Sequence, residues 1–225
     1  MALVFVHGSG CSGLYFHYQA RHFKPSYAVN LPGHPEGEPC TGIQEYVEWL
    51  RSHIHGMGLS ELVLAGHSMG GAIAQLYALT YPQELRGIVL IGAGARLRVH
   101  PKYLEECQEA MQGSNRWLEN QEAGLSRVDA EVREMLMQSH REIGPAVMLN
   151  DLRCCDEFDI MDRVQEVRLP ALVICGSDDA MTPVKYAQYL AEQINGSQLL
   201  VLDGTHMIHL EQPQQVNQAI ERFLD

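Results

Sequence analysis

The chain has 225 residues, of which 46% are hydrophobic and 20% are charged, and its formal net charge is −12. This length and composition indicate one globular domain with a sizeable core, and they exclude a disordered chain. The acidic balance argues against a nucleic-acid partner, and the apolar runs are too short to cross a membrane.

The first part of the chain predicts two strands and a helix. Residues 3–6 are a short apolar run without the basic start of a signal peptide, so we expect a first strand here and a cytoplasmic location. Residues 27–31 are the second expected strand, which runs into the turn Leu-Pro-Gly-His-Pro at residues 31–35. Apolar side chains recur at helical spacing over residues 41–54, where Thr41 is placed as an N-cap.

The remaining apolar segments extend the alternation of strands and helices. Short runs at residues 62–65, 88–92, 172–175 and 198–202 are expected to be buried strands. Residues 213–223 have the pattern of an amphipathic helix with a proline in its first turn. Apolar strands separated by helices predict an α/β fold with a parallel sheet covered on both faces.

One long segment departs from this alternation. Residues 96–166 carry helical patterns and no convincing strand. Because sites in parallel sheets form at the carboxyl ends of the strands, an insertion between two strands is expected to make a helical cap over a site. The alternative is that these helices are simply more of the globular body. We expect residues 1–95 and 167–225 to form the core of what is overall a single structural domain.

A serine stands at an unusual junction in the middle of the chain. The motif Gly-His-Ser-Met-Gly at residues 66–70 follows an apolar strand and directly precedes a helical pattern. A turn this tight brings Cβ atoms into collision, which glycines on both sides of the serine avoid. The motif therefore predicts a G-x-S-x-G elbow that exposes the Ser68 hydroxyl above the edge of the sheet.

The partners that would activate this serine follow later in the chain. A serine hydroxyl becomes a good nucleophile only when a base takes its proton and a third group orients that base. Asp178 and Asp179 come after the strand at 172–175, and His206 comes after the strand at 198–202. Serine, acid and histidine thus occur in the order expected on this kind of sheet, with either aspartate as the acid.

Two backbone amides are candidates for an oxyanion hole. The amide of Met69 directly follows the nucleophile, and a second amide is expected from the loop after the first strand. Ser9 is the predicted donor in that loop, and Gly10 is the alternative. The small residues there allow the backbone to approach a substrate closely.

These motifs resemble those of the α/β-hydrolase fold superfamily, and in particular its small, cofactor-free, capped carboxylesterase-like branch. The similar pieces are His-Gly at residues 7–8, Leu-Pro-Gly-His at 31–34, the elbow, residues 176–183 and Gly-Thr-His-Met at 204–207. The resemblance implies that the acid is Asp179, three residues after Gly176 in the form D-x-x-T-P. Most relatives carry two further strands before the His-Gly loop, so a reduced, parallel sheet of six strands is implied. Asn30 stands where relatives commonly have aspartate.

The resemblance and the residues together predict a serine hydrolase. Ser68 would attack the acyl carbon of a small-molecule carboxylic ester or thioester, with His206 as the base and Asp179 orienting it. No cofactor and no metal is expected. A thioesterase, a carbon–carbon hydrolase and a lyase of the menaquinone-synthesis type are alternatives that use the same triad. A non-catalytic binding protein on this fold is a further alternative from another class.

The sequence also makes predictions about the substrate pocket, a zinc site and the cysteines. The expected substrate pocket is lined by His7, Met111, Met135, Met148, Met181 and Met207, although core filling would explain each methionine about as well. His53 and His55 do not share a helix face, so no zinc site is expected from them. The six cysteines show no paired spacing and are expected to be reduced thiols.

Overall fold

The computed structural model describes residues 2–225 and contains one six-stranded sheet in the order β2-β1-β3-β4-β5-β6. All neighbouring strands are parallel. The strands are β1 (Ala2–Val6), β2 (Ser26–Val29), β3 (Leu62–His67), β4 (Leu85–Ile91), β5 (Ala171–Gly176) and β6 (Gln198–Leu202). The predicted fold class and parallel six-stranded sheet are confirmed, although β4 begins at Leu85 rather than at Ile88.

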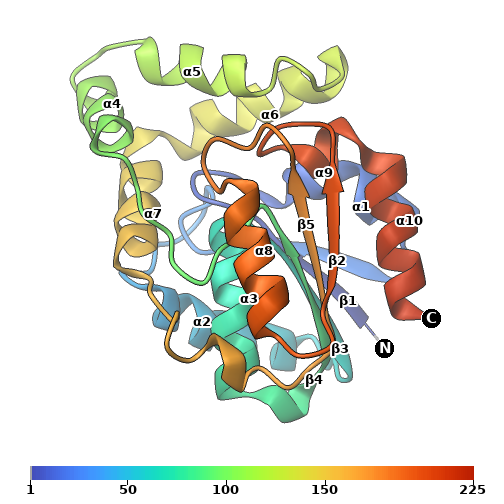
Figure 1. The fold of residues 1–225 in the computed structure, drawn as a ribbon. Coiled ribbons are helices and arrows are strands. Elements are labelled where there is room, and N and C mark those ends of the chain that lie inside the picture. The colour runs from blue at the N-terminus through green and yellow to red at the C-terminus, as the bar shows by residue number, and fades with distance from the viewer. Residues whose placement is uncertain (1) are drawn as a thin grey trace.

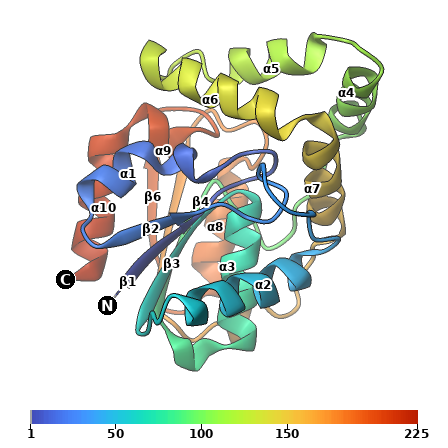
Figure 2. The ribbon, with the colours of Figure 1, turned by 180° about the vertical axis from the view of Figure 1, so that it is seen from behind.

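Helices cover both faces of the sheet (Figures 1 and 2). The α-helices are α1 (His17–His22), α2 (Ile43–Gly56), α3 (Met69–Thr80), α4 (Pro101–Met111), α5 (Arg116–Gly124), α6 (Ala130–Ile143), α7 (Pro145–Glu157), α8 (Val184–Gln193), α9 (Ile208–Glu211) and α10 (Pro213–Leu224). Short 3-10 helices are η1 (Gly13–Phe16), η2 (Pro82–Glu84) and η3 (Val164–Glu166).

Alternate side chains of the strands enter two separate cores. Val4 and Leu64 pack with α2, α3 and α8 on one face, whereas Phe5 and Ala65 pack with α9 and α10 on the other. Side chains alternate in direction along a strand, so a strand buried on both faces must be apolar at every position. This requirement explains why the strands read as continuous apolar runs.

The amino terminus of α2 differs from the prediction. Gly42 is the N-cap residue, and no side chain caps the first turn. Thr41 lies one residue earlier, where its amide and hydroxyl donate to the Glu45 carboxylate at 2.9 and 3.1 Å. The prediction of a Thr41 N-cap is therefore wrong, because the Glu45 side chain reaches back and engages the threonine itself.

An insertion of four helices, α4 to α7, stands between β4 and β5. Figures 1 and 2 show α5 and α6 across the carboxyl edge of the sheet and α7 descending beside the body of the protein. Outside the helices, Arg96 and Asp159 form an isolated β-bridge that joins the two ends of the insertion. We propose this insertion as the cap, with residues 96–166 as its extent. No helix within residues 2–225 is long and apolar enough to cross a membrane.

Candidate active site

Ser68 is the single residue between the end of β3 and the start of α3. Its backbone angles, φ 53° and ψ −115°, lie in a region that costs energy for a residue with a Cβ atom. The Ser68 amide donates to the Ile91 carbonyl at 2.9 Å, which ties the turn to β4. This strained turn places the serine at the carboxyl edge of the sheet, under the insertion.

The flanking glycines are required by close approach of the backbone. A Cβ atom on Gly66 would overlap the carbonyl oxygen of Gly70, and one on Gly70 would overlap the carbonyl oxygen of Val6. Neither neighbour is a flexible side chain that could move aside. The turn at Ser68 therefore tolerates no side chain at either position.

His206 and Asp179 meet in the loops that follow β6 and β5. Nδ1 of His206 lies 2.8 Å from Oδ2 of Asp179, and both side chains are buried. Because an ionised carboxylate only accepts hydrogen bonds, Nδ1 carries a proton and donates it to this bond. In the neutral imidazole, Nε2 is then the bare nitrogen, which is the tautomer that a general base requires.

The Asp179 carboxylate is held ionised by its surroundings. Its Oδ1 accepts the amides of Met181 and Thr182 at 2.9 and 2.8 Å, and its Oδ2 accepts the Thr182 hydroxyl at 2.8 Å. Burial acts to raise the pKa of Asp179, but the nearby His206 and these hydrogen bonds together lower it below its ordinary value. Asp178 instead points to solvent, where Arg127 donates to it at 3.1 Å. The structure places Asp179, and not Asp178, against the histidine.

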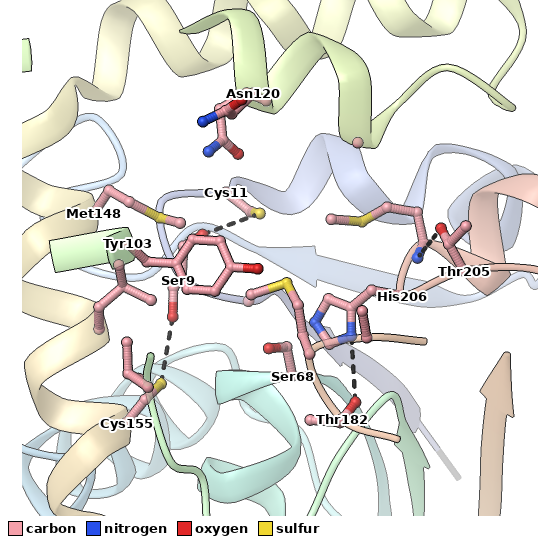
Figure 3. Close-up of a pocket in the computed structure, with 18 of the residues that line it drawn as sticks. Ser9, Cys11, Ser68, Tyr103, Asn120, Met148, Cys155, Thr182, Thr205 and His206 are labelled. Atoms are coloured by element: carbon pink, nitrogen blue, oxygen red, sulfur yellow. Dashed lines mark hydrogen bonds between the residues drawn. The ribbon is translucent and has the colours of Figure 1, made fainter. Parts of the chain in front are cut away.

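Ser68 and His206 line one cavity, in which both are labelled in Figure 3. The hydrogen bonds of residues 2–225 do not include one between them, so a reaction that uses both requires the Ser68 hydroxyl to turn toward Nε2. The cavity has a volume of about 390 Å³, which suits a small organic ligand. Its apolar lining consists of Leu97, Val99, Tyr103, Met148, Leu152, Met181 and Met207, among others.

The loop after β1 forms another part of the cavity wall. Gly8 and Ser9 line the cavity, and the Ser9 hydroxyl lies 3.3 Å from the Cys155 sulfur of α7. The Gly10 amide is already engaged, because it donates to Oδ2 of Asp151 at 2.8 Å. Of the two amides predicted as oxyanion donors in this loop, that of Gly10 has an acceptor within residues 2–225, and none is found there for that of Ser9.

Asp151 of α7 joins the insertion to the body of the protein. It is fully buried, with His34 Nε2 at 2.8 Å from its Oδ2 and the Tyr46 hydroxyl donating to its Oδ1 at 2.8 Å. Asp151 belongs to none of the sequence motifs that predicted the site. The sequence feature that could have pointed to Asp151 is its position three residues after Met148, which places a carboxylate on the apolar face of a predicted helix. Such a carboxylate needs buried partners.

The predicted pocket residues separate into two groups. Met148, Met181 and Met207 line the cavity, whereas Met111, Met135 and His7 do not. Glu106 of α4 lines the cavity, and Met111 lies five positions further along, on another side of the helix, where it is 57% exposed. Met135 packs in an apolar cluster that includes Leu136 and Tyr15. These pocket predictions are corrected, because on α4, α6 and α7 helix phase rather than residue type decides which methionine faces the cavity.

His7 holds the backbone beneath the site instead of facing a ligand. Its Nδ1 donates to the Gly8 carbonyl at 2.9 Å, and its Nε2 accepts the Leu31 amide at 3.1 Å. Burial, followed by the effect of His34, lowers the pKa of His7 to about 3. Asn30 has a similar structural role, since its side-chain oxygen accepts a hydrogen bond from the Gly13 amide at 2.8 Å. His7 is therefore a neutral hydrogen-bonding residue of the fold.

Histidines beside the site are also buried. The centroid of the His67 ring lies 4.7 Å from that of His206 and 4.4 Å from that of His209, and His67 Nε2 donates to the His206 carbonyl at 3.0 Å.

The histidines of α2 do not form a metal site, since His53 stacks on Trp49 at the surface of this helix. Within residues 2–225, no three His, Cys, Asp or Glu side chains are grouped as a metal site would require.

These buried histidines predict loss of stability in mild acid. Burial lowers the pKa of His7 and His209 to about 3 and that of His140 to about 4, against an ordinary 6.5 in the unfolded chain. Between pH 6.5 and 4 the unfolded chain binds protons that the folded protein does not. As the pH is lowered through that window, the free energy of unfolding should therefore decrease, by up to about 1.4 kcal/mol per pH unit for each histidine.

Urea unfolding at pH 7.5, 6.5 and 5.5 measures this slope. His209→Gln should reduce the change in the free energy of unfolding between pH 7.5 and 5.5 by about 1.4 kcal/mol, and His53→Gln on the surface of α2 serves as the matched control. A free energy of unfolding that stays constant from pH 7.5 to 5.5 would contradict the burial of neutral histidines.

The model of the alpha/beta hydrolase family matches residues 3–219. Two similar proteins come from Acinetobacter baylyi, and each is 26% identical over 99% of this chain. They are an (E)-2-((N-methylformamido)methylene)succinate hydrolase, of which 90% is covered, and 3-oxoadipate enol-lactonase 2, of which 88% is covered. A solved thermophilic esterase is 29% identical, with a TM-score of 0.83 over 99% of this chain and 88% of its own. Because the family model spans nearly the whole sequence, this chain belongs to the alpha/beta hydrolase family.

Proposed function

We propose that this protein is a serine hydrolase that cleaves a carboxylic ester through an acyl-enzyme on Ser68. The observation that carries the proposal is the buried hydrogen bond between His206 and Asp179 at the wall of the cavity that Ser68 also lines. The names of similar proteins support the ester class, since one is an esterase and another is an enol-lactonase. A lactone is an internal carboxylic ester.

The proposed reaction moves one proton back and forth through His206. Nε2 takes the proton of the Ser68 hydroxyl while the serine oxygen attacks the acyl carbon. His206 then gives the proton to the alcohol oxygen as its bond to the acyl carbon breaks, which leaves an acyl-enzyme. Water repeats the two steps and releases the carboxylic acid. Asp179 keeps Nδ1 protonated and stabilises the imidazolium that forms.

Two backbone amides would stabilise the oxyanion that develops in each step. The Met69 amide is at the first position of α3, where a helix has no internal acceptor for it. In the loop after β1, Asp151 accepts the Gly10 amide and so favours the neighbouring Ser9 amide as the second donor. We propose Met69 and Ser9 as the oxyanion hole, with Asp151 as a positioning residue that acts through Gly10.

A sulfur-substituted substrate tests this part of the proposal. Amides placed for an oxygen anion stabilise a sulfur anion poorly, so the wild-type protein should strongly prefer an ester over the matching thionoester. Asp151→Leu, which keeps a similar side-chain volume but offers no acceptor for the Gly10 amide, should lower kcat for the ester by about 100-fold and reduce this preference. Tyr46→Phe, which removes another hydrogen bond of Asp151 without contacting Gly10, is the control. If Asp151→Leu slows both substrates equally, Asp151 has only a general structural role.

Labelling with a fluorophosphonate tests the proposed function as a whole. We expect one adduct on Ser68, located by mass spectrometry of the folded protein and its peptides, because the reagent requires an activated serine. A panel of p-nitrophenyl esters and acyl-CoA thioesters would then separate an esterase from a thioesterase. Absence of any adduct on folded protein would refute a serine hydrolase and favour a binding protein on the same fold.

A further inference from the structure

Glu106 of α4 is a carboxylate at the wall of the candidate cavity. The residue is 6% exposed, and its side chain is 8% exposed. Tyr103, one turn earlier on α4, points into the cavity in Figure 3. Residues three positions apart share a helix face, so Glu106 continues the surface that Tyr103 presents to the cavity.

The Glu106 carboxylate has one ion-pair contact and no hydrogen bond within residues 2–225. Among residues 2–225 its nearest cation is Arg116, whose Nη2 is 3.8 Å from Oε1, beyond hydrogen-bonding distance. The Arg116 side chain is itself 62% exposed, so water competes for its charge. No hydrogen-bond donor in the described part of the chain reaches Glu106, although a buried charge needs such donors.

The other acidic groups of the site, Asp178 of the cavity lining and Asp179 outside it, are already satisfied. Asp179 is bonded to His206 and Thr182, and Asp178 is paired with Arg127. The arginine of the cavity lining, Arg98, is 58% exposed and has Asp159 as its acidic neighbour at 3.9 Å. Glu106 is thus the acidic residue of this lining whose charge the protein leaves without a hydrogen bond.

We propose that Glu106 forms a subsite for an ammonium group carried by the ester substrate. The ammonium N–H groups would supply the missing donors, and their charge would compensate that of a carboxylate whose side chain is only 8% exposed. An ester with a carboxylate in this position would be repelled. Esters that carry an ammonium group are thus the proposed substrate class of the esterase. The subsite rests on the proposed function only for turnover, because binding of an ammonium ion requires no catalysis.

Two series of esters test the proposal through turnover. One series varies the acyl end, with p-nitrophenyl hexanoate, 6-aminohexanoate and hydrogen adipate. The other varies the alcohol end, with butyrates of 1-pentanol, 5-aminopentanol and 5-hydroxypentanoic acid. In at least one series, kcat/KM at pH 7.5 should be about 10- to 100-fold higher for the ammonium ester than for the methyl-ended one, and lowest for the carboxylate.

Matched variants test whether the preference for the ammonium ester comes from Glu106. Glu106→Gln keeps the shape of the side chain and should abolish the preference, while hydrolysis of the methyl-ended ester changes little. Glu105→Gln removes the same charge from an exposed neighbouring position on α4 and should keep the preference. Equal loss on all three esters of a series with Glu106→Gln would show a structural role and overturn the subsite.

A binding measurement separates this proposal from the proposed function. Hexylammonium is titrated calorimetrically into the Ser68→Ala protein, with hexanol and hexanoate as comparison ligands. Tighter binding of hexylammonium, lost with the added Glu106→Gln substitution, supports the subsite even if no ester is hydrolysed. Equal or absent binding of all three ligands overturns the subsite, whether or not wild-type protein turns over neutral esters.

Discussion

Replacing Ser68 with alanine is expected to lower kcat for ester hydrolysis by a factor of about 10⁴ to 10⁶. The substitution removes the only atom that would form the acyl-enzyme, while His206 and Asp179 keep their hydrogen bond. Folding should be unaffected, because alanine meets the same backbone requirement at φ 53° that serine does. Steady-state kinetics measure the loss, and circular dichroism with thermal unfolding verifies the fold.

A second serine of the same cavity supplies the control. Ser9 would contribute its backbone amide and not its side chain, so Ser9→Ala should retain most of the activity. Its hydroxyl contacts the Cys155 sulfur at 3.3 Å, a weak bond whose loss costs little. Turnover in Ser68→Ala equal to that of the wild type would assign the nucleophile to another residue.

Replacing Asp179 with asparagine should lower kcat by a factor of about 10⁴ at neutral pH. The asparagine amide would donate toward His206, so Nδ1 would become the acceptor and Nε2 would hold the proton. A histidine in that tautomer is unable to take the proton of Ser68. Asp179 also accepts the Met181 and Thr182 amides at Oδ1. In the variant the single oxygen of asparagine would stay with these two amides, so its NH2 group would face His206.

Asp178→Asn is the matched substitution at the adjacent position. It removes an exposed ion pair with Arg127, for which an effect of about 0–1 kcal/mol on stability and little effect on kcat is expected. Both variants are compared with wild type in pH profiles of kcat/KM. A large loss with Asp178→Asn and a small one with Asp179→Asn would reverse the assignment of the acid.

The strands and the serine elbow could be predicted because they depend on local rules. A strand buried on both faces must be apolar throughout, as residues 62–65 and 172–175 are. The elbow needs glycines where backbone segments cross, and Gly66 and Gly70 are in those places. Thr41 failed as an N-cap because the competing contact with Glu45 depends on side-chain reach, which sequence spacing leaves open.

The contacts of the candidate site depend on distances between segments far apart in the chain. Asp151 and Gly10 are 141 positions apart, and only the packing of α7 on the loop after β1 brings them together. Whether a methionine lines the cavity depends on the phase of its helix against the core, which excluded Met111 and admitted Met148. A composition with many methionines does not encode that phase.

The sequence by itself determined the fold class, the order of the strands along the chain and the residue types available for serine chemistry. These follow from periodicity, from backbone sterics at glycine and from the chain order of Ser68, Asp179 and His206. The tertiary structure alone decided that Glu106 faces the cavity without a hydrogen-bond donor and that Asp151 engages Gly10. Burial and hydrogen-bond satisfaction are properties of the packed helices, because a side chain's partners are set by its distance from the other segments rather than by its neighbours in sequence.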